Sequence, residues 1–418
     1  MRKLIILFVS VITLAYGVKA QDIKVGAAFR DITPDKTPVM VSGGAGAPSP
    51  ANIIIGKLTT RALVITKGDT KLAIVSIDNI GVPMVVGDRI RAKVKGIKPE
   101  NILIGATHTH SAPDAYGLAD ENGNSGTDLK YIDMMVEKTA EAINEALKKA
   151  KPAYLKVAVD EAKGKIAYNY YAPRLYDPRC GVMQYISAKD GKTIATLVNY
   201  AIHPEVIGPD RNICSPDLVG PLYEKIEKEA GGMAIYMNSA QGGMVTADNR
   251  RPEGKEANDW DECVRIGELL GSEALRIISN AEVQKDPQVF ITSEDVKLPV
   301  ETDLMKYILH YSLFKYPITD KGEAVTRMNL LNIGNAQVVT IPGEALPNIG
   351  FYLKRNMHTK NPFLFGLTND AFGYIIVKED FNGFERYSYI SETSLGEKTA
   401  ELVEKAALDL IDKSPAAE

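Results

Sequence analysis

The feature that most constrains this chain is the repeated alternation of short apolar segments of β type with longer amphipathic segments along 418 residues. The clearest helical pattern runs from Leu129 to Lys149, where apolar residues recur every three or four positions. Further helices are expected at 218–229, 260–279, 345–356 and 395–411. Strands are expected at 62–65, 72–77, 102–110, 154–159, 194–203, 233–237, 289–291, 330–333 and 336–341. This alternation predicts an α/β fold in which layers of helix pack on sheet.

The first 20 residues have the pattern of a cleaved export signal. Arg2 and Lys3 precede an apolar run over residues 4–18, and the run ends in Val18-Lys19-Ala20, which suits a signal peptidase. No other stretch approaches the roughly 18 to 20 apolar residues that cross a bilayer, so we expect no transmembrane segment. The sequence therefore predicts a secreted or periplasmic protein, and the even composition of residues 21–418 predicts one continuous domain.

The net charge of the chain limits the kinds of partner that it can bind. Removal of residues 1–20 takes away three basic residues and no acid, so the formal charge moves from −4 to −7. Such a balance disfavours a nucleic-acid partner or an anionic membrane surface.

Cys180, Cys214 and Cys263 are well separated and lack a CxxC spacing, so neither a disulfide framework nor a cysteine-based zinc site is indicated. One disulfide with one free thiol stays open as an alternative.

Three of the five histidines lie in two short motifs at the ends of predicted strands. In a strand, residues i and i+2 project from the same face, so His108 and His110 are expected to share a face. This suits two metal ligands, or one ligand and one imidazole that faces a substrate. The alternatives are a pair of surface histidines and, for His203, an ordinary residue at a strand end. His310 and His358 stand alone on helix-like segments, and we assign them no site role.

Two later segments also place polar residues directly after apolar runs. Glu344 follows a strand and a Pro-Gly pair, so it lies at the carboxyl end of the strand, where sites in α/β proteins are commonly built. On spacing alone, the better interpretation of Glu344 is an acid in the first turn of a helix, where it complements the helix dipole. Tyr374 follows a strand and a polar turn, and on spacing alone it is a packed tyrosine.

Four motifs in this order carry a family resemblance: THTHSAP, NYAIHP, IPGEA and TNDAFGYI. With them the chain resembles the catalytic domain of the neutral/alkaline ceramidases, secreted zinc amidases that cleave the N-acyl bond of ceramide. The resemblance begins at VGAAFRDITP near residue 25 and continues beyond Tyr374. It implies a layered sandwich of mixed β-sheets flanked by helices, and a small lipid amide as substrate.

The resemblance also implies a set of site residues. Zinc would be held by His108, His203, Glu344 and Tyr374, and His110 would face the substrate carbonyl. Such a ligand set leaves the ion able to polarise water or the amide oxygen near neutral pH.

One departure from the family concerns the nucleophile. The family carries a serine in a GDVSP-type turn, whereas residues 241–249 read QGGMVTADN and place Val245 at the serine position. Valine is no nucleophile, so three alternatives stay open. Metal-activated water attacks directly, Thr246 or Ser239 acts after a small shift of the turn, or activity is lost. Thr246 is the candidate catalytic residue among these side chains.

A second departure concerns the substrate. Tyr170 takes the place of an arginine that positions the substrate in the family, and Arg174 or Arg179 is an alternative from the same loop. Together with neighbouring tyrosines, Tyr170 either contacts an apolar or sugar-like group of a ligand or is an ordinary packing residue. The chain ends at Glu418 soon after the last expected helix, so we expect no C-terminal immunoglobulin-like domain. Residues 114–128 and 246–259 are candidate rims or lids of the site.

Three hypotheses follow. The leading one is a secreted, zinc-dependent amidohydrolase that acts on ceramide or a related lipid amide. The second is a metal hydrolase of the same fold that acts on another amide or an ester. The third is an inactive homologue that retains zinc and binds a lipid or a glycan. The sequence does not indicate an oligomeric state.

Overall fold

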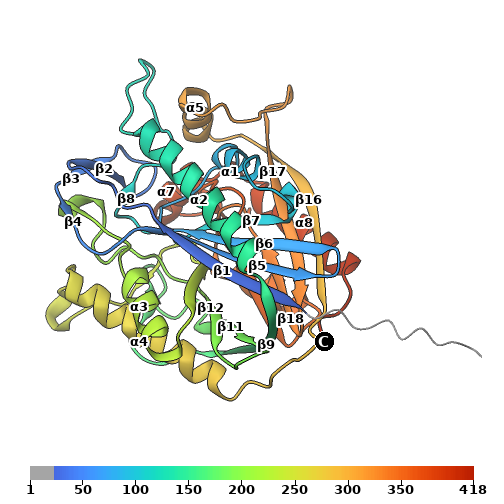
Figure 1. Ribbon diagram of the computed structural model, residues 1–418. Coiled ribbons are helices and arrows are strands. Elements are labelled where there is room, and N and C mark those ends of the chain that lie inside the picture. Colours follow the sequence, from blue (N-terminus) through green and yellow to red (C-terminus); the bar gives the residue numbers. More distant parts are fainter. Residues whose placement is uncertain (1–22) are drawn as a thin grey trace, which may run out of the picture.

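Two β-sheets packed face to face form the centre of the molecule in a computed structural model, which describes residues 23–418 (Figure 1). The strands are β1 (Lys24–Asp31), β5 (Thr59–Lys67), β6 (Thr70–Ile77), β7 (Ile102–Ala106), β9 (Lys151–Glu161), β11 (Arg179–Ser187), β12 (Thr193–Tyr200), β14 (Met233–Asn238), β16 (Val289–Pro299), β17 (Glu323–Ile333), β18 (Ala336–Thr340) and β20 (Asn361–Phe365). The larger sheet has the order β14-β12-β11-β9-β1-β5-β6-β7, and the smaller sheet has the order β16-β17-β18-β20. The expected export signal lies outside the described residues.

Helices cover the outer faces of both sheets. The larger sheet carries α1 (Met84–Arg91) and α2 (Leu129–Lys149) over one part and α3 (Val219–Ala230) and α4 (Trp260–Ser279) over the other (Figure 1). The smaller sheet is covered by α6 (Pro347–Asn356) and α8 (Thr399–Lys413). Two further helices, α5 (Asp303–Tyr311) and α7 (Ser388–Glu392), complete this list. The layers run helix, sheet, sheet, helix, which confirms the expected layered α/β sandwich.

The apolar runs in the sequence follow from burial of both sheet faces. In β5, Leu63 and Ile65 point into the core between the sheets, while Ala62 and Val64 point toward α2. Because neither face meets water, successive residues are all apolar rather than alternately polar. Each such side chain that is fully buried contributes about 1.5–3 kcal/mol to folding. The strands predicted from such apolar runs at 62–65 and 72–77 lie inside β5 and β6.

Several predicted boundaries are confirmed and several are wrong. The helix predicted at 129–149 and the helix predicted at 260–279 have the observed bounds of α2 and α4. Asp128 caps α2 by accepting hydrogen bonds from the backbone N–H groups of Lys130 and Tyr131. The strands predicted to reach His110 and His203 end at Ala106 and Tyr200, because the chain turns there toward the site.

All three cysteines are buried and unpaired, so the structure does not form the disulfide that stayed open. Cys214 packs in the core under α2, while Cys180 on β11 and Cys263 on the inner face of α4 pack in the core that α3 and α4 cover. Burial raises the pKa of Cys180 and of Cys214 to about 12. Within residues 23–418, none of the helices has both the length and the hydropathy that a bilayer crossing requires.

Candidate metal centre and active site

One buried side chain, Asn238, ties together the ends of β7, β12 and β14. Its Nδ2 donates to the backbone oxygen of Thr107 at 3.2 Å and to that of Ile202 at 2.9 Å. Thr107 directly precedes His108, and Ile202 directly precedes His203. Asn238 therefore fixes the distance between the two chain segments that carry these histidines.

His108 enters the site through an unusual backbone conformation. Its φ is 72°, in the left-handed region, which costs a residue with a side chain about 1–3 kcal/mol. Its N–H donates to Asn79 O at 2.8 Å, and its Nδ1 lies 2.6 Å from Ile80 O. The expectation that His108 and His110 share one face of a strand is therefore wrong, because the strand has already ended. The turn instead brings their Nε2 atoms to 3.3 Å.

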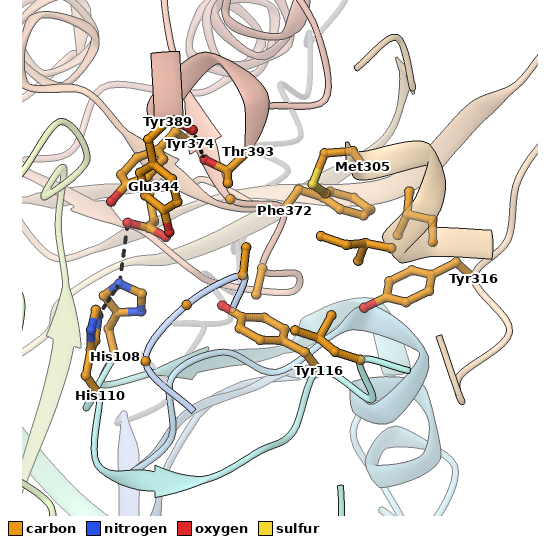
Figure 2. Close-up of a pocket in the computed structure, with 18 residues that line it drawn as sticks. His108, His110, Tyr116, Met305, Tyr316, Glu344, Phe372, Tyr374, Tyr389 and Thr393 are labelled. Atoms are coloured by element: carbon orange, nitrogen blue, oxygen red, sulfur yellow. Dashed lines mark hydrogen bonds and ion pairs between the residues drawn. The ribbon is translucent and has the colours of Figure 1, made fainter. Parts of the chain in front are cut away.

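His108, His110 and His203 form a cluster, which we call the histidine cluster, whose ligand atoms all lie within 4.8 Å of one another. Glu344 closes this cluster: its Oε2 lies 3.4 Å from Nε2 of His108 and 3.1 Å from Nε2 of His203. Figure 2 shows Glu344 above His108, with His110 beside them. All four residues are less than a tenth exposed. Residues from distant parts of the chain thus meet in one buried place.

A short parallel pair of strands brings Glu344 and Tyr374 side by side. In β19 (Glu344–Ala345) and β21 (Tyr374–Ile375), Glu344 pairs directly with Tyr374. Helix α6 begins only at Pro347, and its first turn contains no acid, so the helix-dipole interpretation of Glu344 is wrong. The hydroxyl of Tyr374 lies 3.6 Å from Sδ of Met244.

The turn at residues 241–245 packs directly on β19. Gly242 donates its N–H to Ala345 O at 3.0 Å, and a Cβ atom at position 242 would lie 2.2 Å from Glu344 O. Only glycine fits this approach of the two backbones.

The hydrogen bonds of the two buried rings indicate a place for positive charge. Nδ1 of His108 faces Ile80 O, and Nδ1 of His203 lies 2.8 Å from Val245 O. A carbonyl oxygen only accepts, so Nδ1 carries the hydrogen and a neutral ring presents a lone pair at Nε2. Both Nε2 atoms face the carboxylate of Glu344, which requires a proton or a metal cation between them. Backbone carbonyls on the outer nitrogens are also typical of metal-binding histidines, so these residues fit a zinc ion.

The pKa values describe the same charge balance without a cation. Burial would lower the pKa of His203, but Glu344 and Glu205 outweigh it and raise the pKa to about 9. Burial would raise the pKa of Glu344, but His108 and His203 hold it well below its usual range. The pKa of His110 is well below 6.5, because it is buried and lies beside two other imidazoles. His110 is therefore neutral.

A narrow cavity of about 70 Å³ opens beside the histidine cluster. Its polar end holds His108, His110, Glu344 and Tyr374, and its other end is apolar (Figure 2). The apolar end is lined by Leu118, Met305, Ile308, Leu309 and Phe372. The arrangement suits a ligand with one polar reacting group and one apolar substituent.

Val245 and the two candidate nucleophiles, Thr246 and Ser239, lie outside the cavity. Val245 is fully buried in the core under α3 and α4, where its backbone oxygen holds His203. Thr246 is half-buried in β15 (Val245–Ala247) opposite Tyr168, and it is not among the residues that line the cavity. Ser239 is buried, and its hydroxyl has no hydrogen-bond partner. The structure therefore brings none of these side chains to the cavity.

The residues proposed to contact substrate are also outside the cavity. Tyr170 is 59% exposed and lies against Tyr171, with ring centres 5.7 Å apart. Arg179 pairs through two nitrogens with Asp177, at 2.7 and 2.8 Å. His310 and His358 are exposed and lie outside the histidine cluster.

Sequence reasoning missed other residues of this site. Oε2 of Glu205 lies 3.4 Å from Nδ1 of His110. Tyr389 lines the cavity, with its ring centre 6.0 Å from that of Tyr374, and Tyr116 lies along the floor in Figure 2. Glu205 follows His203-Pro204 directly, so its position in the motif was an available signal. Tyr116 and Tyr389 carried no signal of this kind.

Comparisons with known proteins agree with the fold. Residues 23–255 match the family described as neutral/alkaline non-lysosomal ceramidase, N-terminal. The neutral ceramidase of Pseudomonas aeruginosa is 22% identical over 298 residues, which are 65% of this chain and 44% of that relative. The crystal structure of neutral ceramidase from Pseudomonas aeruginosa superimposes with a TM-score of 0.78 at 17% identity, over 94% of this chain and 75% of that one. A ceramidase complexed with C2 gives 0.76 at 16% identity, over 95% and 76%.

Proposed function

The chain belongs to the neutral/alkaline non-lysosomal ceramidase family, and from this premise we propose that it is a zinc-dependent amidohydrolase. Its substrate is ceramide or a related lipid amide, whose N-acyl bond it hydrolyses. The observation that carries the proposal is the meeting of the histidine cluster and Glu344 at the polar end of a cavity whose other end is apolar. A lipid amide has these two parts, a polar amide and an apolar chain.

In this proposal His108, His203, Glu344 and Tyr374 hold the metal. Zinc, when bound, supplies Lewis-acid chemistry that polarises an amide carbonyl and makes water acidic enough to attack near neutral pH. His110 is assigned to the substrate, as the family resemblance implies, and its Nδ1 faces the carboxylate of Glu205. With the hydrogen on Nδ1, Nε2 of His110 presents a lone pair, 3.3 Å from Nε2 of His108, that can accept a hydrogen bond from water or substrate. The apolar walls orient the acyl part and exclude bulk water.

The position of Val245 favours water as the attacking group. Its side chain is buried in the core, and Thr246 does not line the cavity. A serine or threonine nucleophile needs a base within hydrogen-bond reach. Valine offers no hydroxyl at position 245, and Thr246 lies beside His203 as a backbone bridge partner and does not line the cavity. Among the three alternatives for this turn, direct attack by water is the route we propose.

The test is release of fatty acid and sphingoid base from a defined ceramide by purified residues 21–418, with added zinc or with a chelator. We expect release that depends on zinc. His203→Ala removes one ligand and should abolish zinc binding and activity together, with loss of at least about a hundredfold in rate. His310→Ala, a change at an exposed histidine outside the cluster, should leave both intact. Retained activity in His203→Ala would contradict the ligand assignment.

Two other functions compete, and the burial of Val245 favours both over a serine-dependent ceramidase. One is a hydrolase of the same fold that acts on another amide or an ester, and a substrate panel with no preference for lipid amides would support it. The other is a protein that retains zinc and binds a lipid or a glycan without turnover. Tight binding with no product from the zinc-loaded protein would support that one.

We further propose that residues 1–20 are an export signal, that residues 21–418 form one catalytic domain, and that the protein acts outside the cytoplasm. The support is the charged, apolar and small-residue order at the start of the chain. Sequencing of the N-terminus of the exported protein checks the cleavage after Ala20.

A further inference from the structure

Helix α5 carries more apolar surface than its packing against the protein uses. Met305 and Leu309 are its buried residues, and both line the cavity. A neighbouring stripe consists of Leu304, Tyr307 and Ile308, which are spaced three and four residues apart and therefore share a face of the helix. Leu304 and Ile308 are half-buried, and Tyr307 is 40% exposed. The fold leaves this apolar stripe without a covering element.

The stripe lines a groove at the surface, which we call the α5 groove. The rest of its lining comes from Met40, residues 45–48 and the loop that leads into α2, at residues 118–120 and 124–126. Figure 1 shows α5 and this loop at the same end of the molecule. Ala45, Leu118 and Ile308 line both the α5 groove and the cavity beside the histidine cluster. Because Leu118 and Ile308 belong to the apolar end of the cavity, the α5 groove adjoins that end.

The polar groups of the α5 groove already have partners within the protein. Within residues 23–418, its lining includes a single charged side chain, Asp120. The Asp120 carboxylate accepts hydrogen bonds from the N–H groups of Asn122 and Asn124 and from Nδ2 of Asn124, at 2.8–2.9 Å. The hydroxyl of Ser125 donates to Leu118 O at 2.6 Å. The groove therefore suits an uncharged, apolar ligand better than an ion or a polar headgroup.

We propose that the α5 groove binds one alkyl chain of the lipid amide, which runs from the apolar end of the cavity past Leu118 and Ile308 onto the stripe of α5. The inference rests on the proposed function, because it assigns a place to part of the same substrate. The amide lies at the polar end of the cavity, and the chain continues over apolar side chains on leaving it. Each methylene group that leaves water strengthens binding about fourfold, so even partial cover of the chain contributes to affinity.

Photolabelling tests the location of the chain directly. Two lipid amides are used, one with a diazirine at the end of its acyl chain and one with a diazirine at the end of its amine-side chain, each added to the protein with zinc and with a chelator. We expect one of the two probes to label residues 45–48, 118–126 or 304–308, as found by peptide mass spectrometry. That probe identifies which of the two chains occupies the α5 groove. Labels from both probes outside these residues would overturn the inference.

A pair of substitutions tests the contribution of the groove to turnover. Leu304→Gln combined with Tyr307→Gln places two amides in the groove, and neither residue lines the cavity. We expect kcat/KM to fall at least about tenfold for an amide with two long chains and to stay unchanged for an acetylated short amine. His310→Gln is the matched control, because it introduces the same side chain at an exposed position of α5 outside the groove lining. It should keep both wild-type values.

The two readouts separate the inference from the proposed function. If no amide is hydrolysed but a probe labels the groove and the double variant loses that label, the proposed function fails and the groove assignment stands. If amides are hydrolysed with zinc but the double variant keeps the wild-type kcat/KM for long-chain amides, the function stands and the groove assignment fails. Equal losses on long-chain and short-chain amides would also contradict a role in binding the chain.

Discussion

At the scale of single residues, Val245 shows that a residue can occupy a position matched to the family's nucleophile without having the nucleophile's role. Its side chain faces the core and its carbonyl faces His203, so the position supports a metal ligand without offering a nucleophile. The backbone conformation of the turn determines which way this side chain points. The resemblance places Val245 at the position of the family's serine, and the sequence could suggest that substitution but not the direction of the side chain.

We therefore expect that Val245→Ser adds no serine-dependent route of hydrolysis and that it destabilises the protein. The new hydroxyl would be buried among apolar groups, at a cost of about 1–3 kcal/mol. Rate measurements and urea unfolding check the two parts. Thr246→Val is the companion change: loss of activity in that variant alone would identify Thr246 as the nucleophile and contradict attack by water.

A second residue-scale prediction concerns Asp177, which is 2% exposed and bonded to Arg179 and to Lys354 Nζ at 3.0 Å. Burial would raise its pKa, but Lys354 and Arg179 lower it from 3.8 to about 2. The folded pKa is below the unfolded one, so this stabilisation is present above about pH 4 and is lost as pH falls toward about 2. The amount is about 2 kcal/mol.

Urea unfolding at several pH values measures this effect. Asp177→Asn should be less stable at neutral pH, because Lys354 is left buried without its partner, and should lose that part of the acid sensitivity. Asp35→Asn, at an exposed position, should keep the wild-type slope. An unchanged slope in Asp177→Asn would show that other carboxylates dominate the acid response.

At the scale of elements, the metal centre depends on where strands end. β7, β12 and β14 end together because Asn238 bonds the backbone beyond two of them. Asn238→Ala leaves the carbonyls of Thr107 and Ile202 without this donor, at a cost of about 1–3 kcal/mol for each group that stays buried. We expect zinc affinity to fall along with stability, since the spacing of His108 and His203 is released.

Competition with a chromophoric chelator measures the zinc affinity of this variant. The control is Asn332→Ala, which removes another buried asparagine whose Nδ2 donates to Pro415 O, far along the chain from the site. Both variants should lose stability, but only Asn238→Ala should lose zinc affinity. Equal affinity in the two variants would mean that Asn238 supports the fold alone.

Elements with a strong local signal could be predicted from sequence, and elements defined by distant partners could not. Helix α2 has its apolar period, its cap at Asp128 and lysines in its last turn within one segment. Helix α5 is short and has only Met305 and Leu309 buried, so the sequence marked the segment around His310 as helix-like without giving its bounds. The left-handed turn at His108 depends on Asn79 and Ile80, which no local pattern around His108 reveals.

At the scale of the whole molecule, the site joins parts of both sheets. His108 and His203 follow strands of the larger sheet, and Glu344 follows β18 of the smaller one. The order of four motifs predicted which residues meet, because the resemblance carried the three-dimensional information. The cavity and the α5 side chains that line it depend on packing between distant segments, and a single sequence does not contain a readable signal for that.

A ligand that bridges the sheets should stabilise the whole fold. Zinc at about a hundred times its Kd is expected to add about 2.7 kcal/mol and to raise Tm. Calorimetry with zinc, with chelator and with magnesium measures this. Magnesium prefers oxygen ligands and several waters, so it should give no comparable rise. A Tm that is the same with zinc and with chelator would contradict binding between the sheets.

The reactivity of the three buried cysteines can be used to measure local unfolding of the protein. Cys214 lies under α2, while Cys180 on β11 and Cys263 on α4 share the core that α3 and α4 cover, so the thiols sample two separate parts of the core. A thiolate reacts and a buried thiol with a raised pKa does not, so an aqueous thiol reagent meets these groups only when their layer opens. The rate of colour development with such a reagent, taken with and without zinc, then reads out how often each half of the larger sheet loses its helical cover.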